Sequence, residues 1–363
     1  MKIGIITFQR AYNYGAVLQA YALCKTLNEL GYTCEVIDYH NARFEKDYRK
    51  ISVLKSKSLR EFVSALVHGK TRNAKRKAFV DFVESEVGIS KKEYFTDNIK
   101  EANSEYEVFI TGSDQVWNLN LTGNDWHFFL DFVSSEKKKI SYAASIVALT
   151  NDEVREREIR SKLNGFNHIS MREKSGLEYV KSLGFVDANL VIDPTLLVSR
   201  EKWVGLSRNY IVKTALPEKY LLAYFVSPTK TNMDHVRRLA DEVKLPVVLI
   251  NYTHRKEEGM LNMTCVSPGQ FVYLFDKACM VVTNSFHGTA FSINLNKDFL
   301  FVLNTQVPEK NERVLTLVRL LGLENRDFKT AKLDRRIDWD CVNQKLQALR
   351  EQSIDILKRD IEL

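Results

Sequence analysis

The sequence predicts an α/β protein with two domains. Its 363 residues suffice for two domains of ordinary size, and short apolar segments alternate with helix-like segments along most of the chain. The first forty residues show this pattern clearly, because an apolar segment, a helical periodicity and a second apolar segment follow one another. Strand, helix and strand at this spacing favour a parallel sheet with a right-handed crossover.

The individual elements follow from the apolar pattern. The first strand is expected at residues 2–8, the first helix at residues 15–30 with Gly31 as its stop, and the second strand at residues 33–39. Further strands are expected at residues 106–111, 139–144, 168–171, 190–192, 220–226, 246–251, 279–283 and 298–303. Helices are expected between most of them, for example at residues 174–183, 232–243, 268–276 and 288–294.

We divide the chain into two domains and a terminal helix. The N-terminal domain is expected over residues 1–200 and the C-terminal domain over residues 201–337, with the hinge between Asp193 and Pro217. Residues 338–363 form a charged amphipathic helix that would pack back on the N-terminal domain. A basic helical insert is expected in the first domain at about residues 43–100.

The positive charge of the chain is concentrated in this insert. The whole chain carries 53 Lys and Arg against 46 Asp and Glu, a net charge of +7. Residues 43–77 alone hold twelve Lys and Arg against three Asp and Glu, so the remainder is slightly acidic. The insert is therefore either a solvated helix outside the site or a dock for an anionic membrane surface or acceptor. Nucleic acid is not an expected partner.

Composition excludes several classes of protein. The hydrophobic fraction of 45% and the charged fraction of 27% are those of a globular chain. No run of 18 apolar residues is present, and the apolar start is too short for a signal-peptide core. The five cysteines form no CxxC pair, which indicates a reducing compartment without a disulfide framework or a zinc site. We expect a cytoplasmic protein, with the inner face of the membrane as an alternative location.

The loops that follow strands are the places to search for a site, because ligands of open α/β sheets bind at the carboxyl ends of strands. After the first strand, Asn13 is placed to cap the next helix, and Tyr14 and Gly15 open that helix. Gly15 would let an anion or a hydroxyl approach the helix N-terminus. A plain capped turn explains the same residues equally well.

A second loop gathers a glycine, a hydroxyl, a carboxylate, an amide and an indole. These are Gly112, Ser113, Asp114, Gln115 and Trp117. Carboxylates and amides bind sugar hydroxyls and an aromatic face binds a sugar ring, so the loop suits a sugar. The alternative is structural, with the aspartate as a cap and the tryptophan in the core.

Two further loops carry residues suited to an anion. Arg172 follows an apolar strand, and its guanidinium either binds a carboxylate or phosphate or pairs with a nearby acid such as Glu173 or Asp193. His287 stands beside a predicted helix start, where Gly288 would expose backbone amides. A histidine in that position suits a proton donor or a phosphate ligand.

Taken together, these loops resemble the polysaccharide pyruvyl transferase family. The resemblance rests on RAYNYGAVLQAYAL, VFITGSDQVWN, SYAAS, ISMREKSG followed by VIDPTLL, and TNSFHGTAFSI, in this order along nearly the whole chain. It implies two Rossmann-like domains facing across a GT-B-like cleft. It also implies transfer of a pyruvate ketal from phosphoenolpyruvate to a sugar hydroxyl pair of a bacterial surface glycan or its lipid-linked precursor, as in exopolysaccharide or capsule biosynthesis. Phosphoenolpyruvate would be a co-substrate, with no cofactor and no metal.

The resemblance also assigns roles to residues. His287 would be catalytic and the C-terminal domain would be the donor side. Donor binding is expected for Arg172, Ser285, Gly288 and Thr289, completed by Lys310 or Arg313. From residue chemistry we expect the acceptor to meet Asn13, Tyr14, Gly15, Gly112, Ser113, Asp114, Gln115 and Trp117.

One position departs from the family pattern. Better-studied members carry an arginine two residues before the motif histidine, whereas this chain has Ser285. A cation of the donor site is therefore missing or supplied from elsewhere. Two alternatives follow, a GT-B glycosyltransferase that uses a nucleotide sugar and a non-catalytic relative that binds glycans.

Overall fold

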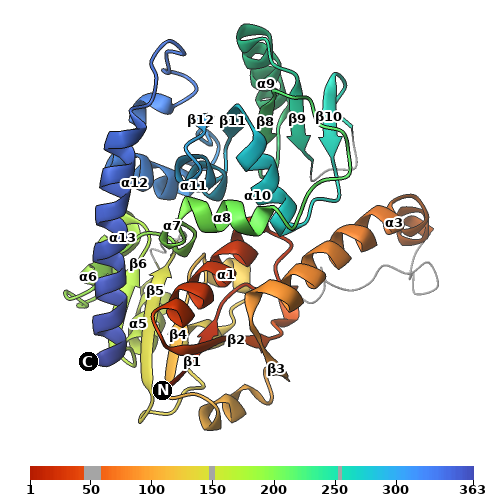
Figure 1. Ribbon diagram of the computed structural model, residues 1–363. Coiled ribbons are helices and arrows are strands. Elements are labelled where there is room, and N and C mark those ends of the chain that lie inside the picture. The colour runs from red at the N-terminus through yellow and green to blue at the C-terminus, as the bar shows by residue number, and fades with distance from the viewer. Residues whose placement is uncertain (45–58, 147–151, 252–255) are drawn as a thin grey trace.

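The strands form two separate parallel sheets, as Figure 1 shows. The computed structural model describes residues 1–44, 59–146, 152–251 and 256–363, without the side chains of residues 59–68 and Lys310. The first sheet has the order β3-β2-β1-β4-β5-β6-β7. Its strands are β1 (Lys2–Ile6), β2 (Thr33–Tyr39), β3 (Ile89–Tyr94), β4 (Val108–Thr111), β5 (Lys138–Ala144), β6 (His168–Met171) and β7 (Asn189–Leu190).

The second sheet repeats the strand order of the first, apart from the last two strands. Its order is β10-β9-β8-β11-β12, with β8 (Leu221–Tyr224), β9 (Val247–Ile250), β10 (Met260–Met263), β11 (Met280–Thr283) and β12 (Asp298–Phe301). In both sheets the strand order reverses next to the first strand, between β1 and β4 and between β8 and β11. Such switch points open a crevice at the carboxyl ends of the strands.

Helices cover the sheets, and apolar side chains fill the layers between them. Along β4, Val108 and Ile110 belong to one core cluster and Phe109 to another, because alternate residues of a strand face opposite sides. The described helices are α1 (Tyr14–Glu29), α3 (Leu59–Phe82), α4 (Leu119–Thr122), α5 (Glu153–Leu163), α6 (Lys174–Ser182), α7 (Pro194–Leu197), α8 (Arg200–Ser207), α9 (Lys230–Val243), α10 (Pro268–Lys277), α11 (Phe286–Asn294), α12 (Glu312–Leu321) and α13 (Trp339–Glu362).

The alternation of strands and helices is confirmed, but two strands escape the sequence analysis. β3 and β10 are edge strands, and both carry polar residues at positions that a central strand would fill with apolar ones. The basic insert therefore ends before β3, which pairs with β2 as part of the first sheet. Residues 45–58 of the expected insert lie outside the described residues.

The first part of the expected hinge is helical and packed. It contains α7 and α8, and the Trp203 indole is fully buried, with its N–H donating to the Thr195 carbonyl. Across the same interface, Tyr14 stacks on Phe271 with ring centroids 4.6 Å apart. Apolar contacts between the domains thus form one continuous core that includes residues of both.

The C-terminal helix α13 runs along the first domain after leaving the second (Figure 1). Its Ser353 hydroxyl accepts a hydrogen bond from the backbone of Ile192, and Lys138 of β5 donates to the carbonyl of Ile361. These contacts tie the end of the chain to the first sheet. Within the described residues, no helix has the length and apolarity needed to cross a membrane.

Candidate active site

One cavity of about 1280 Å³ collects the loops from both switch points. The first domain contributes the loop after β1, with Asn13, and the loop after β4, with Asp114 and Gln115. The second domain contributes the loop after β8 and the loop after β11, with Ser285 and His287. The cavity is therefore a cleft between the two domains, in the position that the strand orders predict.

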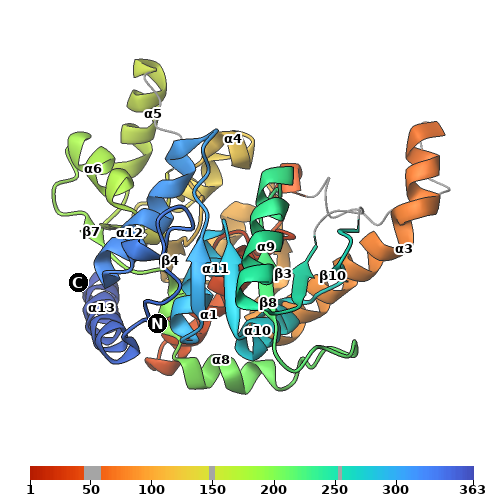
Figure 2. The ribbon, with the colours of Figure 1, turned by 90° about the horizontal axis from the view of Figure 1, so that it is seen from above.

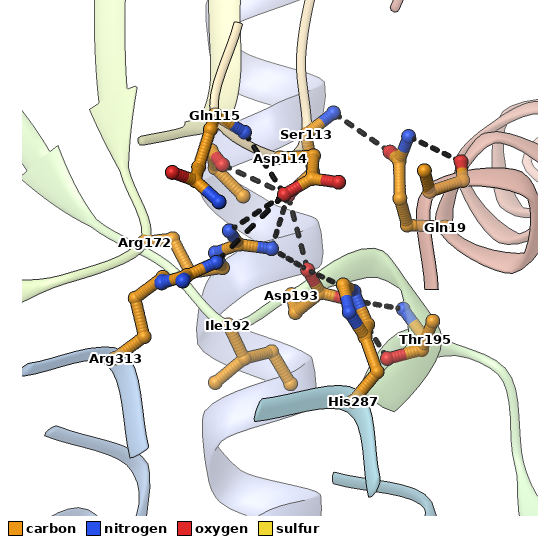
Figure 3. Close-up of polar contacts among 12 residues, drawn as sticks. Gln19, Ser113, Asp114, Gln115, Arg172, Ile192, Asp193, Thr195, His287 and Arg313 are labelled. Atoms are coloured by element: carbon orange, nitrogen blue, oxygen red, sulfur yellow. Dashed lines mark hydrogen bonds and ion pairs between the residues drawn. The ribbon is translucent and has the colours of Figure 1, made fainter. Parts of the chain in front are cut away.

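Alternating charges join the two domains at the floor of this cleft (Figure 3). Asp193 Oδ2 accepts a 2.6 Å hydrogen bond from Arg172 and lies 3.6 Å from His287 Nε2. On its other side, Arg172 lies 3.3 Å from Asp114 Oδ1, which in turn lies 3.9 Å from Arg313. His287 and Arg313 belong to the second domain. The two carboxylates and Arg172 belong to the first domain and face these two residues.

Asp193 is the centre of this cluster, although the sequence indicated it only as a partner for Arg172. It follows β7 and caps α7, where Oδ1 accepts from the Thr195 backbone and hydroxyl at 2.9 and 2.7 Å. Ser113 Oγ lies 3.0 Å from Oδ2. Burial alone would raise the pKa of Asp193, but His287 and Arg172 outweigh it and hold that pKa well below the ordinary value.

Asp114 is held in place by an unusual backbone. Its φ of 74° lies in the left-handed region, which few residues other than glycine adopt. Gly112, with φ 114°, has no room for a side chain, since a Cβ would lie 2.3 Å from the carbonyl oxygen of Tyr142. Burial raises the pKa of Asp114, yet Arg172, His287 and Arg313 together leave it lower than usual. The loop therefore points a charged carboxylate toward the cleft.

Arg172 does not line the cleft. Its side chain is buried, both terminal nitrogens contact carboxylates, and its guanidinium lies 4.6 Å from the centre of the Phe286 ring. The expected donor cation is thus already paired, as the alternative interpretation of the sequence foresaw. The ion pairs of the cluster link the two domains, and they occupy this guanidinium in place of a ligand.

Within the charged cluster at the floor of the cleft, Arg313 is the arginine that lines the cavity. It comes from the start of α12, lines the cleft, and has a buried Nε without a hydrogen-bond partner. Burial and the neighbouring Arg172 lower its pKa, but a guanidinium stays protonated in proteins. A buried N–H that lacks a partner costs free energy until an acceptor arrives. The side chain of Lys310, the other cation expected here, lies outside the described residues.

His287 is positioned by close packing. Ser285 caps α11 by accepting from the Gly288 backbone, and Gly288 is required because a Cβ there would lie 2.3 Å from Thr283 Oγ1. On the other side, a Cβ on Gly15 would lie 1.9 Å from His287 Nδ1. The two glycines therefore make room for the strand end and the imidazole, not for a ligand. His287 Nε2 has no hydrogen-bond partner.

Several residues expected at the acceptor are buried elsewhere. Trp117 is 1% exposed, stacks on Phe129 and donates its indole N–H to the Phe128 carbonyl. Tyr14 donates to the Val266 carbonyl in the domain interface. Ser113 and Thr289 are also fully buried, and neither lines the cavity. Asn13 caps α1 as predicted, through a 3.2 Å hydrogen bond from the Ala16 backbone, and it does line the cavity.

The basic helix α3 belongs to the cleft, contrary to our expectation. Arg72, Lys75 and Arg76 line the cavity together with Thr71 and Asn73. We expected the charged segment to lie outside the site. Local sequence patterns do not show in which direction a long helix runs relative to the rest of the fold. The spacing of the three cations, i, i+3 and i+4, was the available signal that they share one helix face.

The described residues contain one group with metal-ligand geometry, formed by Asp38, His40 and Glu93. Arg10 already donates two 2.6 Å hydrogen bonds to the two carboxylate oxygens of Asp38. A bidentate guanidinium leaves those oxygens satisfied, so we interpret the group as an ion-pair cluster. It does not line the cleft.

Two Rossmann-like domains with a site in the cleft between them define a GT-B-like architecture. The UDP-GlcNAc 2-epimerase of Methanocaldococcus jannaschii, solved in complex with UDP-GlcNAc and UDP, superposes with a TM-score of 0.51 at 10% identity over 99% of this chain and 100% of that one. A putative UDP-N-acetylglucosamine 2-epimerase from Listeria monocytogenes gives 0.47 at 11% identity, covering 98% and 97%. At 10% identity, the likeness to the first of these structures shows the fold alone.

The family is shown by sequence. The model of the polysaccharide pyruvyl transferase family matches residues 13–306, most of the chain, and the protein belongs to this family. That span includes Asn13, Asp114, Arg172, Asp193 and His287. No curated protein matches the chain.

Proposed function

We propose that the protein transfers a pyruvate ketal from phosphoenolpyruvate to two hydroxyls of a sugar in a bacterial surface glycan or its lipid-linked precursor. The observation that carries the proposal is that Arg313 and His287, both from the second domain, line the same interdomain cleft. Arg313 offers a buried N–H without a partner, and the His287 ring lies on the same cavity lining. Family membership makes a transferase the expected class of enzyme.

Phosphoenolpyruvate matches the charges of this wall. The molecule carries a phosphate and a carboxylate, and a guanidinium binds either group through two parallel hydrogen bonds. Arg313 would hold one of these groups and thereby replace the cation that Ser285 does not provide. The capping role of Ser285 explains how the helix start tolerates the loss of an arginine there.

The proposed reaction needs one proton donor and two deprotonations. A proton adds to C3 of the enol, and the oxygen of one sugar hydroxyl bonds to C2 and loses its proton. The C2–O bond to phosphate then breaks, the second hydroxyl oxygen bonds to C2 and loses its proton, and inorganic phosphate leaves. His287 would exchange a proton with the phosphate or the enol, and Asp193, 3.6 Å from its Nε2, would stabilise the charged imidazole.

The opposite wall suits the acceptor. Asn13 and Gln115 present amides, and Asp114 presents a carboxylate, all from the first domain. These groups hydrogen-bond sugar hydroxyls, and their place across the cleft from His287 would put the hydroxyls next to the donor.

Phosphate release on mixing the protein with phosphoenolpyruvate and a lipid-linked glycan tests the proposal. We expect Arg313→Met to raise the KM for phosphoenolpyruvate at least tenfold, because the cation that meets its anionic group is removed. Arg319→Met is the control, since Arg319 lies exposed on the same helix. Turnover of a nucleotide sugar without phosphate release from phosphoenolpyruvate would overturn the proposal in favour of a glycosyltransferase.

The buried position of Trp117 yields a second prediction. Trp117→Phe should lower the free energy of unfolding by roughly 1–3 kcal/mol, because the indole hydrogen bond and packing volume are lost. The Phe128 carbonyl still accepts from Thr111, so no buried acceptor is left unpaired. The KM for the glycan acceptor should stay within twofold in steady-state assays. A tenfold rise in that KM at unchanged stability would place Trp117 at the acceptor after all.

A further inference from the structure

The walls of the cleft carry more positive charge than one small donor needs. Among the described lining residues, five are Lys or Arg and one is a carboxylate. Arg313 faces that carboxylate, and three of the other cations, Arg72, Lys75 and Arg76, come from α3. The cavity volume of about 1280 Å³ exceeds the roughly 300–1,000 Å³ typical of a pocket for one small ligand. The cleft therefore has room and charge for a second anion.

α3 is firmly placed at the cleft. Phe79 packs against Tyr12 and Tyr14 with ring centroids 5.7 and 5.0 Å away. The Cys265 thiol of the second domain donates to the carbonyl of Thr71 at 3.5 Å. Figures 1 and 2 show the helix projecting from the first domain beside the second sheet. One helix thus bridges both domains.

The three cations form a row along the helix. Positions i, i+3 and i+4 share one helix face, and exposure decreases from Arg72 through Lys75 to the buried Phe79. Arg72 therefore lies toward the opening of the cleft. Lys75 lies over the Tyr14 and Phe79 rings, and burial lowers the pKa of its ammonium to about 8. A partly desolvated cation of this kind gains when an anion comes next to it.

We propose that Arg72, Lys75 and Arg76 form an acceptor subsite that binds the pyrophosphate through which the glycan is linked to its carrier. The inference rests on the proposed function, because it takes the first domain as the acceptor side. Three cations in a row suit an extended anion with several charges, and arginines bind its oxygens in pairs. The carrier would leave the cleft past Arg72, while the glycan would reach inward to His287.

Calorimetric titration with inorganic pyrophosphate tests the subsite without phosphoenolpyruvate. We expect Arg72→Ala/Arg76→Ala to weaken binding at least tenfold and Lys77→Ala to leave it unchanged. Lys77 is on the same helix, but it pairs with Asp81 and does not line the cavity. Thermal unfolding of the double variant should match the wild type. Equal binding by the double variant and the wild type would overturn the inference.

Arg313→Met separates this subsite from the donor site. The variant should bind pyrophosphate with unchanged affinity, while its KM for phosphoenolpyruvate rises. A variant that loses affinity for pyrophosphate but keeps the KM for phosphoenolpyruvate would overturn the inference. The pyrophosphate result stands whether or not the protein uses phosphoenolpyruvate, so failure of the subsite and failure of the proposed function are distinguishable.

The carrier is identified by competition against bound pyrophosphate. The two probes are a polyprenyl pyrophosphate sugar in detergent micelles and a UDP-linked sugar. The probe that displaces pyrophosphate at the lower concentration identifies the class of carrier. Displacement by neither would overturn the subsite.

Sedimentation with anionic phospholipid vesicles tests whether the three cations bind a membrane instead. A double variant that loses vesicle binding but keeps pyrophosphate binding would overturn the subsite and indicate a membrane contact.

Discussion

Replacing His287 by asparagine should lower kcat for phosphate release by about a hundred- to ten-thousandfold, the range lost with a positioned acid or base. The imidazole is the titratable ring that lies on the cleft wall beside Asp193, and asparagine cannot exchange a proton near neutral pH. We expect the affinity for phosphoenolpyruvate to change much less than kcat, because Arg313 remains. Steady-state kinetics together with a binding titration measure both quantities.

His168→Asn is the matched control. Its imidazole also lies 3.6 Å from a buried aspartate, Asp360, but it is on β6 and away from the cleft. Turnover should therefore stay within twofold of the wild type. A His287→Asn variant with full kcat would contradict a catalytic role for His287. Absence of turnover by the wild type with every acceptor tested would instead favour a non-catalytic, glycan-binding relative.

The second large effect is expected on stability. Asp193→Asn should lower the free energy of unfolding by about 3–5 kcal/mol, because Arg172 keeps its buried charge and loses its 2.6 Å partner. Glu29→Gln is the control: Lys202 and Glu29 also lie 2.6 Å apart, but at the surface, where a pair contributes under about 1 kcal/mol. Urea unfolding at pH 7 measures both changes.

The same variant should show a characteristic dependence on pH. The folded-state pKa of Asp193 lies below its ordinary value, so its contribution to stability is complete above about pH 4 and is lost as the pH falls further. The difference in unfolding free energy between wild type and Asp193→Asn should therefore shrink on acidification below pH 4. A difference that is small at pH 7, or that grows in acid, would contradict the central role of this ion pair.

Much of the fold could be predicted from local patterns. Central strands are apolar over their whole length because both faces are buried, and amphipathic helices repeat every 3.6 residues. β3 and β10 lie at sheet edges and carry polar residues that interrupt this signal, which is why they were not expected. Ser285 and Asn13 were recognisable as strand-end polar residues, and their capping contacts follow from chemistry that acts within four residues.

The sequence by itself determined the α/β class, the family resemblance and the strand-end loops that hold Asn13, Asp114 and His287. The tertiary structure decided which of those side chains share a cavity. It paired Arg172 with Asp193, brought Arg313 to the wall of the cleft and turned the cations of α3 into the cleft. The physical reason is that strand order and helix direction come from packing between distant segments, and periodicity reports only whether a segment is buried, not what buries it.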